Sequence, residues 1–291
     1  GMAGLAAATT AAERGHDVTL FEASDRIGGQ FTMAAAIPGK EEFKETIRYF
    51  DKRLKVTGVK LKLGTRVTRD ELGASFDAVV VATGVVPRIP KLPGIDHPKV
   101  LSYVDVLRGR KPVGQKVAVI GSGGIGVDVC EFLLHEPDVS IDAWCADWGV
   151  DPKVAAEGGL ATRTPHAPKR TITMLQRKGN VKRMGSGPGK TTGWAHRIVL
   201  EREGVTMLGG VEYLKIDDAG LHIRHDDVVK VLDVDHVVIC AGQESVRDLA
   251  PVDAKGKSTD ARFHVIGGAD VAAELDAKRA IAQGTELAAS L

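Results

Sequence analysis

Apolar positions along the chain gather into short runs, and alanine-rich or charged segments separate these runs. Residues 5–14 are rich in alanine and stop before Gly15, which predicts a helix with a glycine at its C-terminal end. Residues 17–22, Asp-Val-Thr-Leu-Phe-Glu, predict a buried strand that ends in an acidic residue. Residues 76–83 and 237–241 are further apolar runs of strand length. This alternation of helices and apolar strands indicates an α/β protein.

A glycine-rich loop stands in the middle of the chain in a specific context. Residues 116–120 predict an apolar strand, Gly121-Ser-Gly-Gly-Ile-Gly126 follows directly, and residues 127–135 predict a helix. Strand, glycine loop and helix in this order are typical of a dinucleotide-binding unit. Its first two glycines let the backbone approach a pyrophosphate, and the third lets helix and strand pack closely. The sequence therefore predicts Gly121, Gly123 and Gly126 as cofactor-binding residues, with the phosphates at the helix N-terminus.

The start of the chain resembles the second half of the same kind of unit. Gly1 and Gly4 fit the second and third glycines, Ala3 lies between them, and Glu22 follows as the acid expected to bind a ribose. The first glycine and the strand that would precede it are not in the sequence. We therefore expect a fragment whose first domain lacks its first strand.

Two dinucleotide units in one chain predict a nested layout. The run that ends in Ala82-Thr83-Gly84 resembles the tight turn that closes a flavin domain, residues 237–242 end in a matching way, and residues 264–270 return to the first domain. Short strands and turns are predicted over residues 207–236. The predicted fold is α/β, with two Rossmann-like, three-layer domains. An FAD-binding domain comprises residues 1–110 and 244–291, and an NAD(P)H-binding domain comprises the inserted residues 111–243.

Composition excludes several other classes. The 291 residues carry 39 basic and 38 acidic side chains, so a net charge of +1 argues against nucleic acid as a partner. No run of 18 apolar residues is present, so no membrane partner is expected. The three cysteines are widely spaced and exclude a disulfide framework and a CxxC redox motif, which favours a cytoplasmic protein. The nine histidines show no metal-binding spacing, and no metal site is predicted.

Several short runs together resemble one enzyme family over essentially the whole chain. They are Asp-Arg-Ile-Gly-Gly-Gln (25–30), Met-Leu-Gln-Arg-Lys (174–178), Gly-Lys-Thr-Thr-Gly-Trp (189–194), Val-Ile-Cys-Ala-Gly-Gln (238–243) and the C-terminal segment 267–280. The chain is similar to the C-terminal half of bacterial NADPH-dependent 2,4-dienoyl-CoA reductase, an enzyme of fatty acid β-oxidation. The run at 189–194 is the most specific piece, and the glycine loop is the least specific.

The resemblance implies an electron path that the chain holds only in part. In that family electrons pass from NADPH to FAD, then through a 4Fe–4S cluster to FMN in an N-terminal barrel, and finally to a 2,4-dienoyl-CoA. The barrel, the FMN site and the cluster cysteines are absent from this sequence. FMN and the cluster are therefore expected only in the missing N-terminal part, and the dienoyl-CoA only through the missing barrel.

The same resemblance implies a set of FAD-binding residues. Glu22 would accept hydrogen bonds from the adenosine ribose, and Asp270 would hold the ribityl chain, although a plain helix cap is the alternative for Asp270. A helix that begins near Ala277 would direct its positive N-terminus at the flavin C2 carbonyl. Arg48 and Val67 are weaker candidates, with an exposed helix charge and an edge strand as their alternatives. The remaining expected contacts are Gly28, Gly29, Gln30, Thr83, Gly84 and Gly268.

The choice between NADH and NADPH depends on which segment follows the glycine-loop helix in the sheet. Residues 139–144 contain Asp142, and an acid at the strand end would favour the free 2′-hydroxyl of NADH. Residues 171–175 form the better apolar strand and end in Gln176-Arg177-Lys178, whose cations would favour the 2′-phosphate of NADPH. We select the second segment and predict NADPH, bound through Arg177 and Lys178.

Residues 163–197 are locally basic, and phosphate-rich ligands are the favoured explanation over a solvated charged loop or nucleic acid. Lys182 and Trp194 are expected at the substrate side or the interface with the barrel, with ordinary core packing as the alternative for Trp194.

The predicted role is transfer of hydride from NADPH to FAD. This step requires stacking and a short distance rather than an acid or base, so no catalytic side chain is expected. One alternative is a related barrel flavoenzyme with another enoate or an amine as substrate. A structural nucleotide-binding module is the other. Cys130 and Cys240 are expected to be packing residues.

Overall fold

The computed structural model describes residues 1–136, 139–179, 192–273 and 276–291. The chain divides into two compact units, which are Gly1–Arg88 with Ala241–Leu291 and the continuous segment Ile89–Cys240. The predicted boundary after residue 110 lies beyond this division. Residues 100–102 belong to the second unit because they pair in parallel with its strand 236–239.

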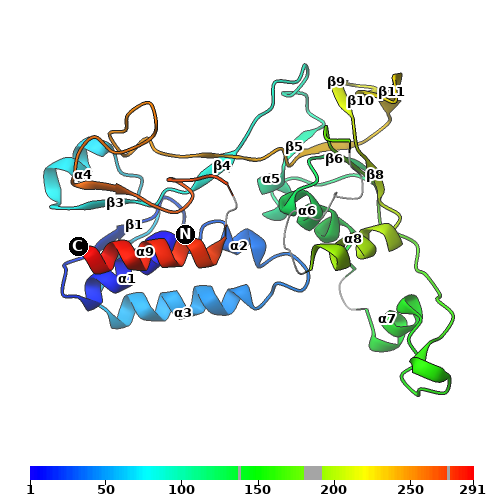
Figure 1. The fold of residues 1–291 in the computed structure, drawn as a ribbon, viewed down its shortest axis with the longest axis horizontal. Coiled ribbons are helices and arrows are strands. Elements are labelled where there is room, and N and C mark those ends of the chain that lie inside the picture. The colour runs from blue at the N-terminus through cyan, green and yellow to red at the C-terminus, as the bar shows by residue number, and fades with distance from the viewer. Residues whose placement is uncertain (137–138, 180–191, 274–275) are drawn as a thin grey trace. The chain divides into compact units, whose positions relative to one another are not determined.

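The first unit combines helices with short strand pairs (Figure 1). Its elements before the division are α1 (Met2–Glu13), β1 (Thr19–Phe21), α2 (Phe31–Ala34), α3 (Phe43–Val56), β2 (Lys60–Lys62), α4 (Arg69–Ser75), β3 (Val79–Val81) and β4 (Val85–Pro87). Its later elements are β13 (Gln243–Ser245), β14 (Phe263–Val265) and α9 (Ala277–Ser290). Strands β1 and β2 pair in parallel, as do β3 and β14, and β4 pairs antiparallel with β13.

Helices α1 and α9 lie side by side and form much of the core of the first unit (Figure 1). Alanines on α1 pack with Ile266 and Ala288, and a second apolar cluster contains Met2, Leu5, Phe50 and Leu54. Gly284 of α9 makes this contact possible. A Cβ atom there would overlap the Ala3 carbonyl oxygen, so a glycine is required for the helices to approach this closely.

The second unit contains a five-stranded sheet and a three-stranded sheet. Its elements up to the middle of the unit are β5 (Val100–Ser102), α5 (Tyr103–Leu107), β6 (Lys116–Ile120), α6 (Gly124–Leu134), α7 (Ile141–Trp148), the 3₁₀ turn η1 (Glu157–Gly159) and β7 (Thr171–Leu175). The later ones are α8 (Gly193–Arg202), β8 (Thr206–Leu208), β9 (Glu212–Asp217), β10 (Gly220–His225), β11 (Val228–Leu232) and β12 (His236–Ile239).

The larger sheet has the order β5-β12-β6-β7-β8, and every neighbouring pair is parallel. Strands β6 and β12 are almost completely buried, as expected for central strands covered on both faces. The order runs from β6 outward through β7 and β8 on one side and through β12 on the other. The topological switch therefore lies between β6 and β12, where ligands of doubly wound sheets bind. Strands β9, β10 and β11 form the antiparallel sheet.

These elements confirm the predicted α/β class and the predicted strand 116–120. The choice of residues 171–175 as the strand after the glycine-loop helix is also confirmed, because β7 pairs with β6. The alternative segment 139–144 contributes instead to helix α7, which Ser140 caps by accepting a hydrogen bond from the Ala143 N–H. Within the described ranges, no helix is long and apolar enough to cross a membrane.

Candidate functional site

The glycine loop of the second unit has the geometry that a dinucleotide cradle requires. Strand β6 ends at Gly121, whose φ of 114° lies in the left-handed region. A Cβ atom at Gly126 would overlap the Gly121 carbonyl oxygen, so loop and helix can pack this closely only with glycine there. Gly123 is the N-cap residue of α6, and a Cβ atom there would meet nothing within 4 Å. The open space lies at the N-terminus of α6, where backbone N–H groups favour an anion.

The segment after β7 lies directly beside this loop. The Gly121 N–H donates to the Leu175 carbonyl oxygen at 2.9 Å, and the Ser122 hydroxyl hydrogen-bonds to the Gln176 side chain. The Gln176 N–H donates to the Leu208 carbonyl at 2.9 Å. Arg177 and Lys178 follow with exposed side chains. The backbone that carries the two cations is therefore fixed at the carboxyl end of the sheet, next to the glycine loop.

The cysteines of this unit are buried packing residues. Cys130 lies on α6, Cys145 on α7 and Cys240 just after β12, and all three are free thiols. Burial raises the pKa of the Cys130 and Cys240 thiols well above the ordinary value, which disfavours the reactive thiolate. The predicted packing role of Cys130 and Cys240 is confirmed by their burial.

In the first unit the residues predicted for FAD lie around the start of α1. Gly28 and Gly29 have φ values of 111° and 57°, and a Cβ atom on Gly29 would come within 3.0 Å of the Gly1 Cα atom. A Cβ atom on Gly4 would lie 3.2 Å from that of Ala82, so a glycine here brings α1 close to the end of β3. Glu22 follows β1, and its carboxylate accepts hydrogen bonds from the Ser24 N–H at 2.9 Å and hydroxyl at 2.7 Å.

Residues at the end of β13 form hydrogen bonds both to the turn after β3 and to the segment after β14. The Thr83 hydroxyl donates to the Val246 carbonyl at 2.5 Å, and the Val246 N–H donates to the Gly84 carbonyl at 3.0 Å. The Ser245 hydroxyl donates to the Gly268 carbonyl at 2.7 Å, and a Cβ atom on Gly268 would lie 3.3 Å from Gly84. Thr83, Gly84 and Gly268 are therefore brought together.

Asp270 is positioned by a residue that the sequence pattern did not reveal. Gln283 of α9 donates its side-chain N–H to the Asp270 carboxylate at 2.9 Å, and its side-chain oxygen accepts the Gly267 N–H at 2.8 Å. The N-cap residue of α9 is Asp276, which accepts the Lys278 N–H at 2.9 Å. The alternative role of Asp270 as a helix cap is therefore wrong. Gln283 is a polar residue in the middle of an amphipathic helix, and no sequence motif marks it as part of a binding site.

Other candidates lie away from these groups. Arg48 is exposed on α3 and forms an ion pair with Glu45 at 2.6 Å, while Val67 packs on the apolar cluster of Leu72, Val79 and Phe263. Ala277 and Gln30 are partly buried, with Ala277 as the first residue of α9. Trp194 on α8 is 68% exposed, so the alternative prediction that it packs in the core is wrong. Lys182 lies outside the described residues.

In a comparison with protein-family models, residues 1–267 match the family described as pyridine nucleotide-disulphide oxidoreductase. The chain belongs to the pyridine nucleotide-disulphide oxidoreductase family. Membership implies binding of FAD and NAD(P), and the glycine loops of both units fit these cofactors because a Cβ atom on Gly29 or Gly126 would crowd the neighbouring loop backbone. The "disulphide" of the family name has no counterpart here, since the three cysteines are buried and unpaired.

Curated relatives of this family member are oxidoreductases of greater length. It is 31% identical to a metal reductase of Desulforamulus reducens over 254 residues, which cover 86% of this chain and 37% of the relative. It is 38% identical to a cinnamate reductase of Clostridium sporogenes over 139 residues, which cover 47% of this chain and 20% of the relative. The chain thus spans well under half the length of these relatives.

Solved structures agree on the fold of the family member. A 2-naphthoyl-CoA reductase complex matches with a TM-score of 0.78 and 27% identity over all of this chain and 38% of that one. Thioredoxin reductase of T. acidophilum matches with a TM-score of 0.70 and 15% identity, over 94% of its own length, and shows the shared fold alone. The predicted pair of Rossmann-like dinucleotide-binding domains is confirmed, and the chain is a flavin oxidoreductase module.

Proposed function

We propose that this chain is the NADPH-to-FAD module of a larger reductase of the 2,4-dienoyl-CoA reductase type. The observation that carries the proposal is the fixed position of Arg177 and Lys178 beside the glycine loop. Two cations at the end of the strand after the glycine-loop helix suit the 2′-phosphate of NADPH, whereas NADH-binding units place an acid there.

Each unit contributes to binding and orientation. The N-terminus of α6 and the glycines 121, 123 and 126 hold the nicotinamide pyrophosphate, and Arg177 and Lys178 hold the 2′-phosphate. In the first unit Gly1, Gly4 and Gly29 admit the flavin pyrophosphate, Glu22 binds the ribose, and Asp270 holds the ribityl chain. When both cofactors are bound, the nicotinamide supplies hydride and the flavin accepts it. No acid or base of this chain is required for that exchange.

The acyl substrate belongs to the longer polypeptide proposed to contain this module, together with FMN and the 4Fe–4S cluster. Support comes from relatives named cinnamate reductase and 2-naphthoyl-CoA reductase, of which the chain spans 20% and 38%. A reductase of another enoate or an amine is the alternative. Activity of the complete polypeptide on 2,4-dienoyl-CoA, cinnamate and amines distinguishes these substrates. Turnover of the amine alone would contradict the enoyl-CoA assignment.

Anaerobic reduction of the flavin tests the module itself. NADPH is expected to bleach the flavin absorbance of the FAD-loaded chain faster than NADH at equal concentration. Arg177→Ala/Lys178→Ala is expected to lower the affinity for NADPH by about 10–100-fold. Each charged hydrogen bond contributes about 1.5–3 kcal/mol, and solvent screening reduces this contribution at exposed sites. The affinity for NADH should change little.

The matched control is Lys153→Ala/Lys230→Ala, which removes two exposed cations elsewhere in the second unit. This control is expected to behave like the wild type with both nucleotides. Equal losses of affinity for NADPH and for NADH in the Arg177→Ala/Lys178→Ala variant would contradict the NADPH assignment. A chain that binds FAD but is not reduced by either nucleotide would support the alternative of a structural nucleotide-binding module.

A further inference from the structure

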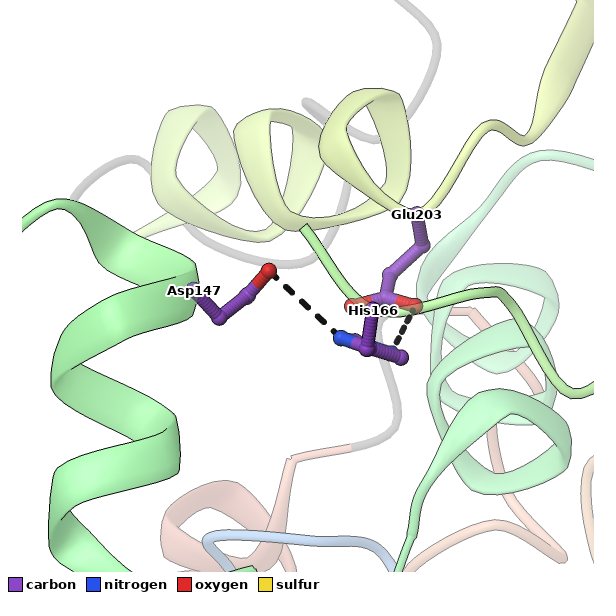
Figure 2. A group of neighbouring side chains, drawn as sticks. All are labelled: Asp147, His166 and Glu203. Atoms are coloured by element: carbon purple, nitrogen blue, oxygen red, sulfur yellow. Dashed lines mark ion pairs between the residues drawn. The ribbon is translucent and has the colours of Figure 1, made fainter. Parts of the chain in front are cut away.

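Three potential metal ligands converge in the second unit, away from the glycine loop in sequence. Asp147 lies in the last turn of α7, His166 lies in the segment between η1 and β7, and Glu203 follows α8 directly. Figure 2 shows the imidazole of His166 between the two carboxylates. His166 Nδ1 lies 3.5 Å from Asp147 Oδ1, and Nε2 lies 3.2 Å from Glu203 Oε2. One ligand atom from each residue lies within 4.8 Å of the other two.

The backbone around His166 is fixed before any ion binds. The Ala161 N–H donates to the Gly149 carbonyl and the Thr164 N–H donates to the Ala146 carbonyl, each at 2.9 Å. Arg163 Nε donates to the Asp147 carbonyl at 2.5 Å. These bonds attach the segment before His166 to the C-terminal turn of α7. The approach of His166 to Asp147 therefore follows from local backbone structure rather than from the two side chains alone.

A second, independent observation concerns the Glu203 carboxylate. Its Oε2 atom is buried, and among the described residues its contact with His166 Nε2 at 3.2 Å lacks the geometry of a hydrogen bond. A buried carboxylate oxygen without a donor is costly, and native structures normally resolve it with a water or an ion.

His166 cannot satisfy both carboxylates as a neutral ring. Neutral imidazole has one N–H donor and one lone pair, so only one of its nitrogens can donate a hydrogen bond. Arg163 places one guanidinium nitrogen 3.3 Å from Asp147 Oδ1 and balances one of the two negative charges. The formal charges of Asp147, Glu203 and Arg163 sum to one negative charge, which a bound cation would balance.

The donor set selects the class of cation. One imidazole nitrogen and two carboxylate oxygens suit a first-row transition ion, whereas Ca²⁺ takes about 6–8 oxygen ligands. Zn²⁺ binds such ligands at about 2.0–2.2 Å with tetrahedral geometry, and a fourth position can hold water. The His166 side chain is 42% exposed, while those of Asp147 and Glu203 are 16% and 18% exposed. His166 is therefore the most exposed of the three proposed ligands.

We propose that Asp147, His166 and Glu203 bind one Zn²⁺ ion, which joins α7, the segment before β7 and the end of α8. The same helices already contact each other through Arg202, whose guanidinium lies 4.2 Å from the Trp148 ring centre. The ion has a structural role in this arrangement. It holds residues 139–170 against α8, and it is independent of the proposed hydride transfer.

Calorimetric titration of the metal-stripped, untagged chain with Zn²⁺ tests this site at neutral pH. The wild type is expected to bind one ion per chain. His166→Asn and Asp147→Asn are each expected to lower the affinity by more than about tenfold, because losing even an outer-shell partner costs about 10–100-fold. The matched control is His97→Asn, since His97 pairs at 3.2 Å with the single carboxylate of Asp218. It should bind Zn²⁺ like the wild type.

Thermal unfolding with and without Zn²⁺ provides a second readout. The ion is expected to raise the Tm of the wild type and of His97→Asn but not of His166→Asn, because a ligand that binds only the folded state stabilises it. Circular dichroism establishes that each variant is folded, and Glu203→Gln replaces Asp147→Asn if the latter is not. Absence of Zn²⁺ binding by the wild type would overturn the proposal, because His166 would then serve only as a bridge between carboxylates. Equal binding by His166→Asn and His97→Asn would also overturn it.

Discussion

The glycine-rich segments of the two units are held in place by different parts of the structure, a parallel sheet in one and a pair of helices in the other. In the second unit Gly121 continues a strand buried in the middle of a five-stranded parallel sheet, and the loop is fixed by bonds to β7. In the first unit the parallel strands form two separate pairs, and the region around Gly1 and Gly4 rests on the contact between α1 and α9. The same glycine motif therefore depends on sheet register in one case and on helix packing in the other. Damage to one support should leave the other site working.

The largest expected effect comes from Gly126→Ala. A Cβ atom would overlap the Gly121 carbonyl oxygen and displace the loop, with strain of about 1–3 kcal/mol. Affinity for NADPH should fall by about 10–100-fold, since each 1.4 kcal/mol is tenfold. FAD content should stay unchanged. Fluorescence titration with NADPH and the flavin spectrum measure the two effects. Gly179→Ala, at a position with nothing within 4 Å of a Cβ atom, is the control.

Gly284→Val makes the reciprocal change in the first unit. The added side chain would collide with the Ala3 carbonyl and separate α9 from α1, at a cost of about 1–3 kcal/mol in the free energy of unfolding. The variant should lose FAD while NADPH binding persists. Urea unfolding and FAD retention after gel filtration measure this. Gly73→Ala, whose Cβ atom would be in ordinary contact with Phe263 at 3.8 Å, should retain FAD. Equal loss of both nucleotides in Gly284→Val would show that the two supports are not separate.

Gln283→Met should have a smaller effect, confined to the first unit. It removes the hydrogen bonds to Asp270 and to the Gly267 N–H while keeping the side-chain length. Each such bond contributes about 0.5–1.5 kcal/mol, so the FAD dissociation constant should rise by about tenfold. Glu286→Gln, at an exposed position of the same helix, is the control for equilibrium FAD binding. An unchanged constant in Gln283→Met would exclude a positioning role for Gln283.

The smallest expected effect is a pH dependence in the second unit. Burial lowers the pKa of His236, whose Nδ1 accepts the Gly114 N–H at 3.0 Å. The unfolded chain therefore binds this proton at higher pH than the folded chain, and stability is lost as pH falls below about 6.5. His236→Asn keeps an acceptor and should flatten the slope in urea midpoints between pH 8 and 5.5. His16→Asn, at an exposed position in the first unit, should retain the wild-type slope.

Sequence patterns predicted the elements that a continuous run of residues defines. The strand at 116–120, the glycine loop and the choice of residues 171–175 over 139–144 all depend on local apolar runs and glycine spacing, and the structure confirms them. The pattern could not reveal contacts between distant residues. Gln283 beside Asp270 and the cluster of His166 with Asp147 and Glu203 require tertiary folding to meet. Cofactor roles assigned to single residues remain predictions.

The paired strands β4 and β13 have a consequence for how the chain can evolve. Residues 88 and 241 mark the two points where the chain leaves and re-enters the first unit, and the Arg88 N–H donates to the Gly242 carbonyl at 3.0 Å. The whole segment 89–240 is thus attached at one joint made of two neighbouring strands. A domain inserted between two neighbouring strands can be exchanged or lengthened as a whole without a change in the fold of the domain that contains it. Recombination at this joint offers a simple route to new electron donors on an unchanged flavin scaffold.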